Sequence, residues 1–252
     1  MIGVFDSGVG GLNVLREIRG VLPDADLLYV ADRARAPYGP KTLDEVERIA
    51  LEVTGWLVDR GSTTVVVACN TASAAALESI RHRYPEIPIV GMEPAVKPAA
   101  LASKSRKMAV LATAATFQGK LFESVVSRFA DGVEVITRAC PEWVELVENG
   151  EIAGRRAEAI VGAVVGPLES QGTDVLVLAC THFSFLRPVM ESLASLEVID
   201  PAPAVAAQTK RVAADVSGRG DLVLAASGDR ADFTRLAGAL ASISASVIPF
   251  PS

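Results

Sequence analysis

The chain has 252 residues, which is enough for one large domain or for two α/β lobes that each bury a core. Half of the residues are hydrophobic and the formal net charge is −6. This acidic balance gives no indication of a nucleic-acid partner, which requires a basic surface. No stretch approaches the length of apolar sequence that spans a bilayer, so no membrane partner is expected.

The cysteine count and the first residues bear on the cellular compartment. The chain opens directly on an apolar strand pattern, without the charged segment and cleavage site of a secretory signal. Three cysteines are an odd number and a poor basis for a disulfide framework. We therefore expect free thiols and a cytoplasmic location.

Short β-branched runs alternate with longer amphipathic stretches. In chain order, the pattern predicts strand Ile2–Phe5, strand Leu27–Ala31, helix Thr42–Arg60, strand Thr64–Ala68, helix Thr71–Tyr84, strand Met108–Ala112, strand Val133–Thr137, helix Arg155–Gln171, strand Asp174–Ala179 and strand Leu222–Ala226. Near-continuous apolar strands are typical of parallel sheets covered on both faces. The alternation predicts an α/β fold with mainly parallel sheets.

One short pattern occurs twice, as Val65-Val66-Val67-Ala68-Cys69-Asn70-Thr71 and as Val175-Leu176-Val177-Leu178-Ala179-Cys180-Thr181-His182. A strand followed by a turn also recurs, at Ile2–Asp6 and at Ala109–Thr113, in the same order. This repetition predicts two pseudo-symmetric lobes with the active site in the cleft between them. We expect residues 1–95 plus 206–252 to form the first lobe and residues 96–205 the second.

The two repeated cysteines point to proton transfer. Each follows a predicted strand, at the end of a parallel sheet where ligands bind. Each also precedes a predicted helix, whose dipole lowers the pKa of a thiol and favours the thiolate. Two thiols that face each other across a cleft suit the movement of a proton from one face of a carbon to the other. Cys140, which precedes Pro141, is expected to be a packing residue.

Polar residues accompany both cysteines. Asp6 follows the first strand and is placed to orient or deprotonate Cys69, although it also suits a turn. His182 is a candidate proton partner for Cys180, and Glu148 closes a predicted helix, where it fits a solvated acid equally well. The loop Pro37-Tyr38-Gly39-Pro40 offers N–H groups and a phenol to a carboxylate. Hydroxyls follow several strands and can hold charged groups without arginine; they belong to Ser7, Thr71, Thr113, Thr116 and Thr181.

Three other classes of protein share parts of this pattern. A zinc protein would use Cys69, Cys180 and His182, although the tight Cys-x-x-Cys spacing is missing. A dinucleotide-binding enzyme is suggested by Gly8-Val9-Gly10, but Asn13 stands where the third glycine of that fingerprint belongs. A binding protein that kept the cleft without turnover is the third alternative, and retention of both thiols argues against it.

Taken together, these motifs resemble the glutamate racemase family, within the cofactor-independent aspartate/glutamate racemase superfamily. The similarity covers nearly the whole chain in the right order. The segments that carry it are Gly3–Leu12, Pro37–Gly39, Ala68–Ser73, Glu93–Lys97, Thr113–Thr116 and Ala179–Phe183.

The resemblance implies interconversion of L- and D-glutamate without pyridoxal phosphate, metal or any other cofactor, to supply D-glutamate for bacterial peptidoglycan. It also implies two α/β lobes and a homodimer. A sister enzyme of the superfamily, such as an aspartate racemase, shares the paired cysteines and remains an alternative.

Site roles are carried over by position. Cys69 and Cys180 match the two acid/base thiols, with Cys180 deprotonating L-glutamate and Cys69 deprotonating D-glutamate. Asp6 would assist Cys69, and His182 together with Glu148 would assist Cys180. The residues implied to bind substrate are Asp6, Ser7, Tyr38, Gly39, Asn70, Thr71, Thr116, Thr181 and His182. Two positions depart from the family pattern: Arg33 stands where Thr is common, and Ala112 where Gly is usual.

Overall fold

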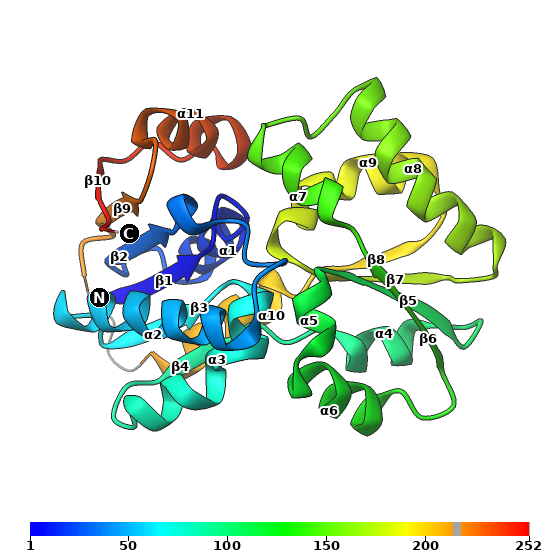
Figure 1. The fold of residues 1–252 in the computed structure, drawn as a ribbon, viewed down its shortest axis with the longest axis horizontal. Helices are drawn as coiled ribbons and strands as arrows, with labels where there is room; N and C mark the ends of the chain where they lie inside the picture. The colour runs from blue at the N-terminus through cyan, green and yellow to red at the C-terminus, as the bar shows by residue number, and fades with distance from the viewer. Residues whose placement is uncertain (214–217, 252) are drawn as a thin grey trace.

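Two α/β halves lie side by side in the molecule (Figure 1). The structure is a computed structural model that describes residues 1–213 and 218–251. The chain builds most of one half, crosses to the other and returns, so that both ends lie in the same half (Figure 1). This arrangement brings segments that are far apart in sequence to one junction.

Each half is built on a parallel sheet. The first sheet has the strand order β10-β9-β2-β1-β3-β4 and the second the order β6-β5-β7-β8. Every recorded pairing is parallel. The strands are β1 Ile2–Asp6, β2 Leu27–Ala31, β3 Thr64–Val67, β4 Ile89–Gly91, β5 Lys107–Ala112, β6 Glu134–Ala139, β7 Val175–Ala179, β8 Glu197–Ile199, β9 Leu222–Ala226 and β10 Val247–Pro249. The predicted α/β class with parallel sheets is confirmed.

Helices cover both faces of each sheet. They are α1 Leu12–Val21, α2 Leu43–Asp59, α3 Asn70–Arg83, α4 Val96–Ala102, α5 Ala114–Gln118, α6 Lys120–Phe129, α7 Pro141–Glu148, α8 Arg155–Ser170, α9 Arg187–Leu193, α10 Ala202–Val212 and α11 Arg230–Ala241, with 3-10 helices η1 Arg33–Arg35 and η2 Thr181–Leu186. Within the described part of the chain, none of the helices combines the length and apolar character needed to cross a membrane.

The packing explains why the strands are so apolar. Side chains of α2 and α3, such as Ile49 and Leu77, pack with Phe5 and Val67 on one face of the first sheet. The other face contacts α1, α10 and α11, and its core continues into the second half through α7, α8 and α9. The remaining face of the second sheet packs against α4 and α6. Strands buried on both faces have no polar side to alternate with.

The strands of the first sheet come from residues 2–91 and 222–249, and those of the second from residues 107–199. The expected lobe boundaries, between residues 95 and 96 and between residues 205 and 206, fall between these groups of strands. The exact boundaries are still predictions. Residues 214–217 and 252 of the predicted first lobe lie outside the described residues.

Local signals placed several element ends correctly. The Thr42 hydroxyl accepts a hydrogen bond from the Glu45 N–H at 3.2 Å, as expected for a helix start. Gly61, which follows α2, has a φ of +84° and ends the helix there. The sequence patterns missed the three-residue strands β4, β8 and β10, because so short a run shows no periodicity.

Candidate active site

A cavity of about 370 Å³ lies where the carboxyl ends of β1, β3, β5 and β7 meet. Both halves of the molecule contribute to it, as the predicted cleft requires. Its lining contains most of the predicted site residues, namely Ser7, Tyr38, Gly39, Cys69, Asn70, Thr71, Cys180, Thr181 and His182. Parallel α/β sheets bind ligands at this end because helix N-termini and loops converge there.

Cys69 comes from the first half and caps helix α3. Its sulfur accepts a long hydrogen bond from the Ala72 N–H at 3.5 Å, and its thiol lies 3.9 Å from the Ser7 hydroxyl. Burial and then the charge of Asp6 raise the pKa of the Cys69 thiol to about 12, against the lowering by the Ala72 N–H. The prediction that the helix terminus lowers the pKa of Cys69 is therefore wrong in net direction, because at this buried position desolvation raises the pKa by more.

Cys180 comes from the second half and has different neighbours. A helix starts after it as expected, here the 3-10 helix η2, and among the described residues no backbone N–H caps its side chain. Its sulfur lies 3.7 Å from Nδ1 of His182. The other ring nitrogen, Nε2, lies 2.7 Å from Oε1 of Glu148. Cys180, His182 and Glu148 therefore form a hydrogen-bonded chain along which a proton can be transferred.

The charge of His182 follows from these contacts. Burial is the largest influence and opposes the cation, but the hydrogen bonds to Cys180 and Glu148 together raise the pKa of His182 well above 6.5. The pKa of Glu148 is lowered: burial raises it, but the hydrogen bond and charge of His182 and further donors outweigh that effect. The two groups form an ion pair beside Cys180 at neutral pH.

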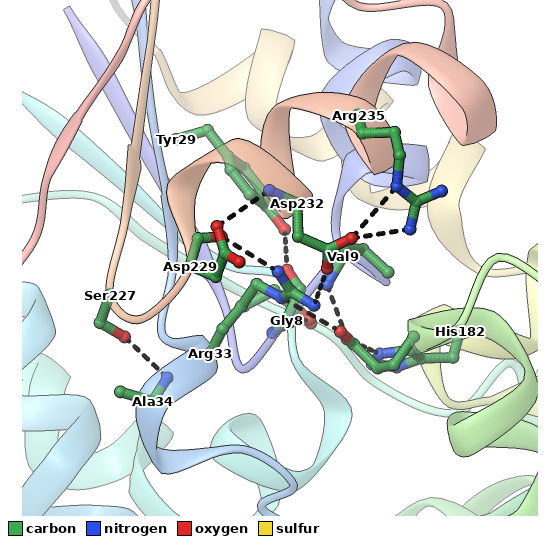
Figure 2. A network of polar contacts seen from close by, with 12 residues as sticks. Gly8, Val9, Tyr29, Arg33, Ala34, His182, Ser227, Asp229, Asp232 and Arg235 are labelled. Atoms are coloured by element: carbon green, nitrogen blue, oxygen red, sulfur yellow. Dashed lines mark hydrogen bonds and ion pairs between the residues drawn. The ribbon is translucent and has the colours of Figure 1, made fainter.

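Glu148 reaches this place from the last turn of α7 and contacts the first half. Its Oε1 also accepts the Val9 N–H at 2.8 Å, and its Oε2 lies 3.3 Å from Nε of Arg33. Figure 2 shows its three partners, Val9, Arg33 and His182, close together. The sequence could not distinguish this position from a solvated helix end, because its partners are remote in the chain.

Asp6 is fully buried between the two cysteine motifs. Its carboxylate accepts the Gly8 N–H at 2.9 Å and the Thr181 hydroxyl at 3.0 Å. Burial raises its pKa, with His182 acting in the opposite direction. One hydrogen bond of Asp6 therefore comes from its own turn and the other from the Cys180 motif, whereas its effect on Cys69 is through its charge.

The glycines of Gly8-Val9-Gly10 allow the two halves to approach each other. A Cβ added to Gly8 would collide with Oε1 of Glu148, and one added to Gly10 would lie 2.6 Å from Nδ1 of His182. Because these glycines have no side chain, Glu148 and His182 can lie against them. This close packing explains the glycines without the dinucleotide phosphate that the dinucleotide-binding hypothesis would require.

The Pro37–Gly39 loop borders the cavity, but its phenol is already engaged. Tyr38 is buried and donates its hydroxyl hydrogen to Oδ2 of Asp32 at 2.6 Å. Arg35 and Ser227 donate to the same carboxylate. Asp32 thus anchors the loop, and the groups left for a ligand are the loop's backbone N–H groups.

Hydroxyls and one amide complete the polar lining. The hydroxyls of Thr71 and Thr113 lie 2.9 Å apart, and Thr116 lies 2.9 Å from Thr113, so the three link the two halves. Within the part of the chain that the structure describes, neither polar atom of the buried Asn70 amide has a hydrogen-bond partner. Because an unpaired buried amide is costly, Asn70 is a candidate contact for a polar group of a ligand.

The structure also brings in residues that the site prediction omitted. Val144 and Glu145 of α7 line the cavity. Thr113, one of the hydroxyls that follow a predicted strand, lines it too. Nothing in the sequence marks the first two, because they enter through helix packing. Cys140 is buried beside α7 and lies outside the cavity lining, as expected of a packing residue.

The alternative of a zinc site requires Cys69, Cys180 and His182 to group around one point. Over residues 1–213 and 218–251, no three His, Cys, Asp or Glu side chains are grouped so that they could hold a metal ion. Cys69 and Cys180 have separate polar neighbours instead of converging on one point with His182.

Comparison with known proteins identifies the family. Residues 12–209 match the family described as Asp/Glu/Hydantoin racemase. A glutamate racemase from Roseiflexus sp. is 50% identical over 221 residues, which are 87% of this chain and 80% of the relative. The chain belongs to the glutamate racemase family.

Solved structures of this family share the whole fold. A glutamate racemase isoform from Bacillus anthracis has a TM-score of 0.88 and 28% identity, with 100% of this chain and 97% of that chain covered. The Escherichia coli glutamate racemase, solved with L-glutamate and the activator UDP-MurNAc-ala, has a TM-score of 0.86 and 27% identity, with 98% and 96% covered.

Proposed function

We propose that this protein interconverts L- and D-glutamate, with Cys69 and Cys180 as the two acid/base groups. One observation carries the proposal: the two cysteines come from different sheets, line a single cavity and have different polar partners. A racemase needs a proton acceptor on one face of the substrate carbon and a donor on the other, and two thiols from different sheets in one cavity support this assignment.

The cavity suits a small dicarboxylic amino acid. None of the described residues that line it is Lys or Arg, so carboxylates would be held by hydroxyls, backbone N–H groups and the Asn70 amide. Ser7, Gly39, Thr71 and Thr181 are our candidates for these contacts, with Thr116 supporting Thr71. The bound L-glutamate in the Escherichia coli relative supports the choice of ligand.

In the proposed reaction, the thiolate of Cys180 takes the Cα proton of L-glutamate and the thiol of Cys69 gives a proton to the opposite face. The products are D-glutamate, a Cys180 thiol and a Cys69 thiolate, and the reverse reaction exchanges the roles. The developing carbanion requires a site that excludes water and supplies hydrogen-bond donors. Asp6 and the His182–Glu148 pair would adjust the two thiols.

The charges of the site favour this starting state. A Cys69 pKa of about 12 keeps that thiol protonated at neutral pH, ready to donate. Nδ1 of His182 lies 3.7 Å from the Cys180 sulfur, so the imidazole is placed to exchange a proton with that residue. We call each thiol with its polar neighbours a station: the Cys69 station contains Ser7, and the Cys180 station contains His182 and Glu148. The two stations therefore differ in electrostatics as well as in composition.

The test is incubation of the purified protein with L-glutamate in heavy water. We expect D-glutamate to form and deuterium to appear at its Cα. Replacing Cys69 or Cys180 with Ala should abolish turnover, because each removes a proton donor or acceptor. Cys140→Ala is the matched control and should keep activity, since Cys140 lies outside the cavity lining.

The absence of both D-glutamate and deuterium incorporation from the unchanged protein would refute the proposal. Full activity in both cavity-cysteine variants would refute the two-thiol mechanism alone. The same assay with aspartate tests the sister activity: a faster rate on aspartate than on glutamate would replace the substrate we propose.

Three further expectations rest on the family resemblance. They are a homodimer, a cytoplasmic location and the supply of D-glutamate for peptidoglycan. Light scattering of the purified protein tests the first, fractionation of cells that produce it tests the second, and rescue of a D-glutamate-requiring bacterial strain tests the third.

A further inference from the structure

Arg33 occupies a junction of charges next to the Cys180 station. It belongs to η1, after β2 of the first half, and only 15% of its side chain is exposed. Its Nε lies 3.3 Å from Oε2 of Glu148, and one terminal nitrogen lies 2.9 Å from Oδ2 of Asp232. The other terminal nitrogen donates to the Asp229 carbonyl at 3.4 Å. The guanidinium therefore bridges α7 of the second half and α11 of the first, as Figure 2 shows for its α11 side.

We propose that Arg33 is a positioning residue, which holds the Glu148 carboxylate in the orientation that receives the His182 Nε2–H and so ties the C-terminal helix α11 to the Cys180 station. The inference rests on the proposed racemase function. Arg33 is not among the residues that line the cavity with the two cysteines, so it acts through Glu148 and His182.

The geometry of the carboxylate gives the reason. Oε1 of Glu148 accepts both the Val9 N–H and the His182 ring N–H, whereas among the described residues Oε2 is contacted by Arg33 alone. The terminal torsion of a Glu side chain is broad, so contacts to one oxygen leave the carboxylate free to rotate. A second contact from a rigid guanidinium removes that freedom.

Asp232 in turn holds Arg33 in place. Its Oδ2 accepts from Arg33, and its Oδ1 accepts from Arg235 at 2.7 Å on the solvent side (Figure 2). Asp229, at the start of α11, uses its side chain to cap the helix and its carbonyl to contact Arg33. Helix α11 thus presents a carboxylate and a carbonyl that orient the guanidinium toward Glu148.

The position also predicts a direction for the titration of His182. The charged or titratable groups around the Glu148–His182 pair are Asp6, Tyr29, Arg33, Glu145, Cys180, Asp229 and Asp232. Simple loss of the Arg33 cation would raise the pKa of His182, since a like charge is removed. Loss of a fixed Glu148 would lower it, because burial opposes the imidazolium once its partner is misplaced. A positioning role therefore gives a decrease.

The experiment combines kinetics with NMR on Arg33→Gln. We expect kcat to fall about tenfold, the size of a charge-assisted hydrogen bond to a partly buried carboxylate, while KM stays within about twofold. The sequence has two His, so the imidazole signal of His182 can be followed by NMR and assigned with a His82→Gln variant. We expect the pKa of His182 to decrease in Arg33→Gln.

Three further variants separate position from charge. Arg33→Lys keeps the cation but cannot bridge both carboxylates, so its kcat should lie between those of the wild type and Arg33→Gln. Asp232→Asn removes the outer anchor and should lower kcat about threefold. Arg235→Gln removes an exposed cation one step further out and should keep kcat within about twofold, which makes it the matched control.

The outcomes distinguish this inference from the proposed function. If the unchanged protein does not racemise glutamate, the function is wrong, and this is evident before any Arg33 variant is measured. If the wild type is active and Arg33→Gln keeps its kcat within twofold, the inference is wrong. An unchanged or increased pKa of His182 in Arg33→Gln overturns it as well. Should Arg33→Gln fail to fold, Asp232→Asn with a wild-type kcat and wild-type His182 titration overturns it equally.

Discussion

Gly10→Ala tests whether the close approach of the two halves sets the activity. Gly10 lies in the turn before α1, and its φ is outside the left-handed region, so alanine is compatible with its backbone. The added methyl group would nevertheless lie 2.4 Å from Oγ1 of Thr181 and 2.6 Å from Nδ1 of His182, the atom that faces the Cys180 sulfur. Space, and not backbone conformation, requires glycine here.

The size of the effect follows from that distance. The imidazole would have to retreat by about 0.8 Å to reach ordinary van der Waals contact with the methyl group. A displacement on the order of 1 Å in a catalytic group costs roughly 10²-fold in rate. Overpacking of this kind costs about 1–3 kcal/mol in stability, which lowers the melting temperature by a few degrees in a chain of this size.

We therefore expect Gly10→Ala to be folded at room temperature with kcat reduced about 100-fold. Glutamate racemisation and thermal unfolding measured on the same preparation check both parts. Gly20→Ala is the control, because Gly20 lies in α1 with no atom within 4 Å of its added Cβ, and it should keep wild-type activity with equal or slightly greater stability. A kcat of Gly10→Ala within threefold of the wild type would refute the reasoning.

Two further predictions concern Asn70 and His182. Asn70→Ala should raise KM for glutamate at least about tenfold and leave the free energy of unfolding unchanged or increased, because the amide has no partner among the described residues to lose. Steady-state kinetics and urea unfolding check this prediction, and a wild-type KM would contradict it. The raised pKa of His182 means that its bound proton stabilises the fold fully below about pH 6.5 and that this contribution is lost as pH rises through the raised value. Wild-type protein should accordingly lose more unfolding free energy than His182→Gln between about pH 6 and pH 9, and equal losses would contradict the ion pair.

Much of the scaffold could be predicted from local sequence. The seven predicted strands all occur, because long β-branched runs between turn residues have few other conformations. Cys69 and Cys180 could be singled out for the same reason: each follows such a run directly and is itself followed by polar residues. The short strand β4 and helices such as α4 and α5 could not be predicted, since their periods are incomplete.

The pairing of site residues was harder to predict than their identity. The sequence suggested Asp6 as a partner of Cys69, whereas its hydrogen bonds run to Gly8 and Thr181. Tyr38 was expected to offer its hydroxyl to substrate, and in the fold it donates to Asp32. Hydrogen-bond partners depend on distances between loops of different halves, and no local pattern encodes those distances.

The sequence by itself determined the α/β class, the two thiols and the neighbouring groups from which a proton-transfer site is assembled, because these depend on strand patterns and residue chemistry. Only the tertiary structure decided how the two thiols differ. Burial and Asp6 keep Cys69 protonated, while His182, Glu148 and Arg33 place an ion pair beside Cys180. These differences arise from desolvation and from contacts of Glu148, two of which join residues more than a hundred positions apart, and both exist only once the halves have packed together.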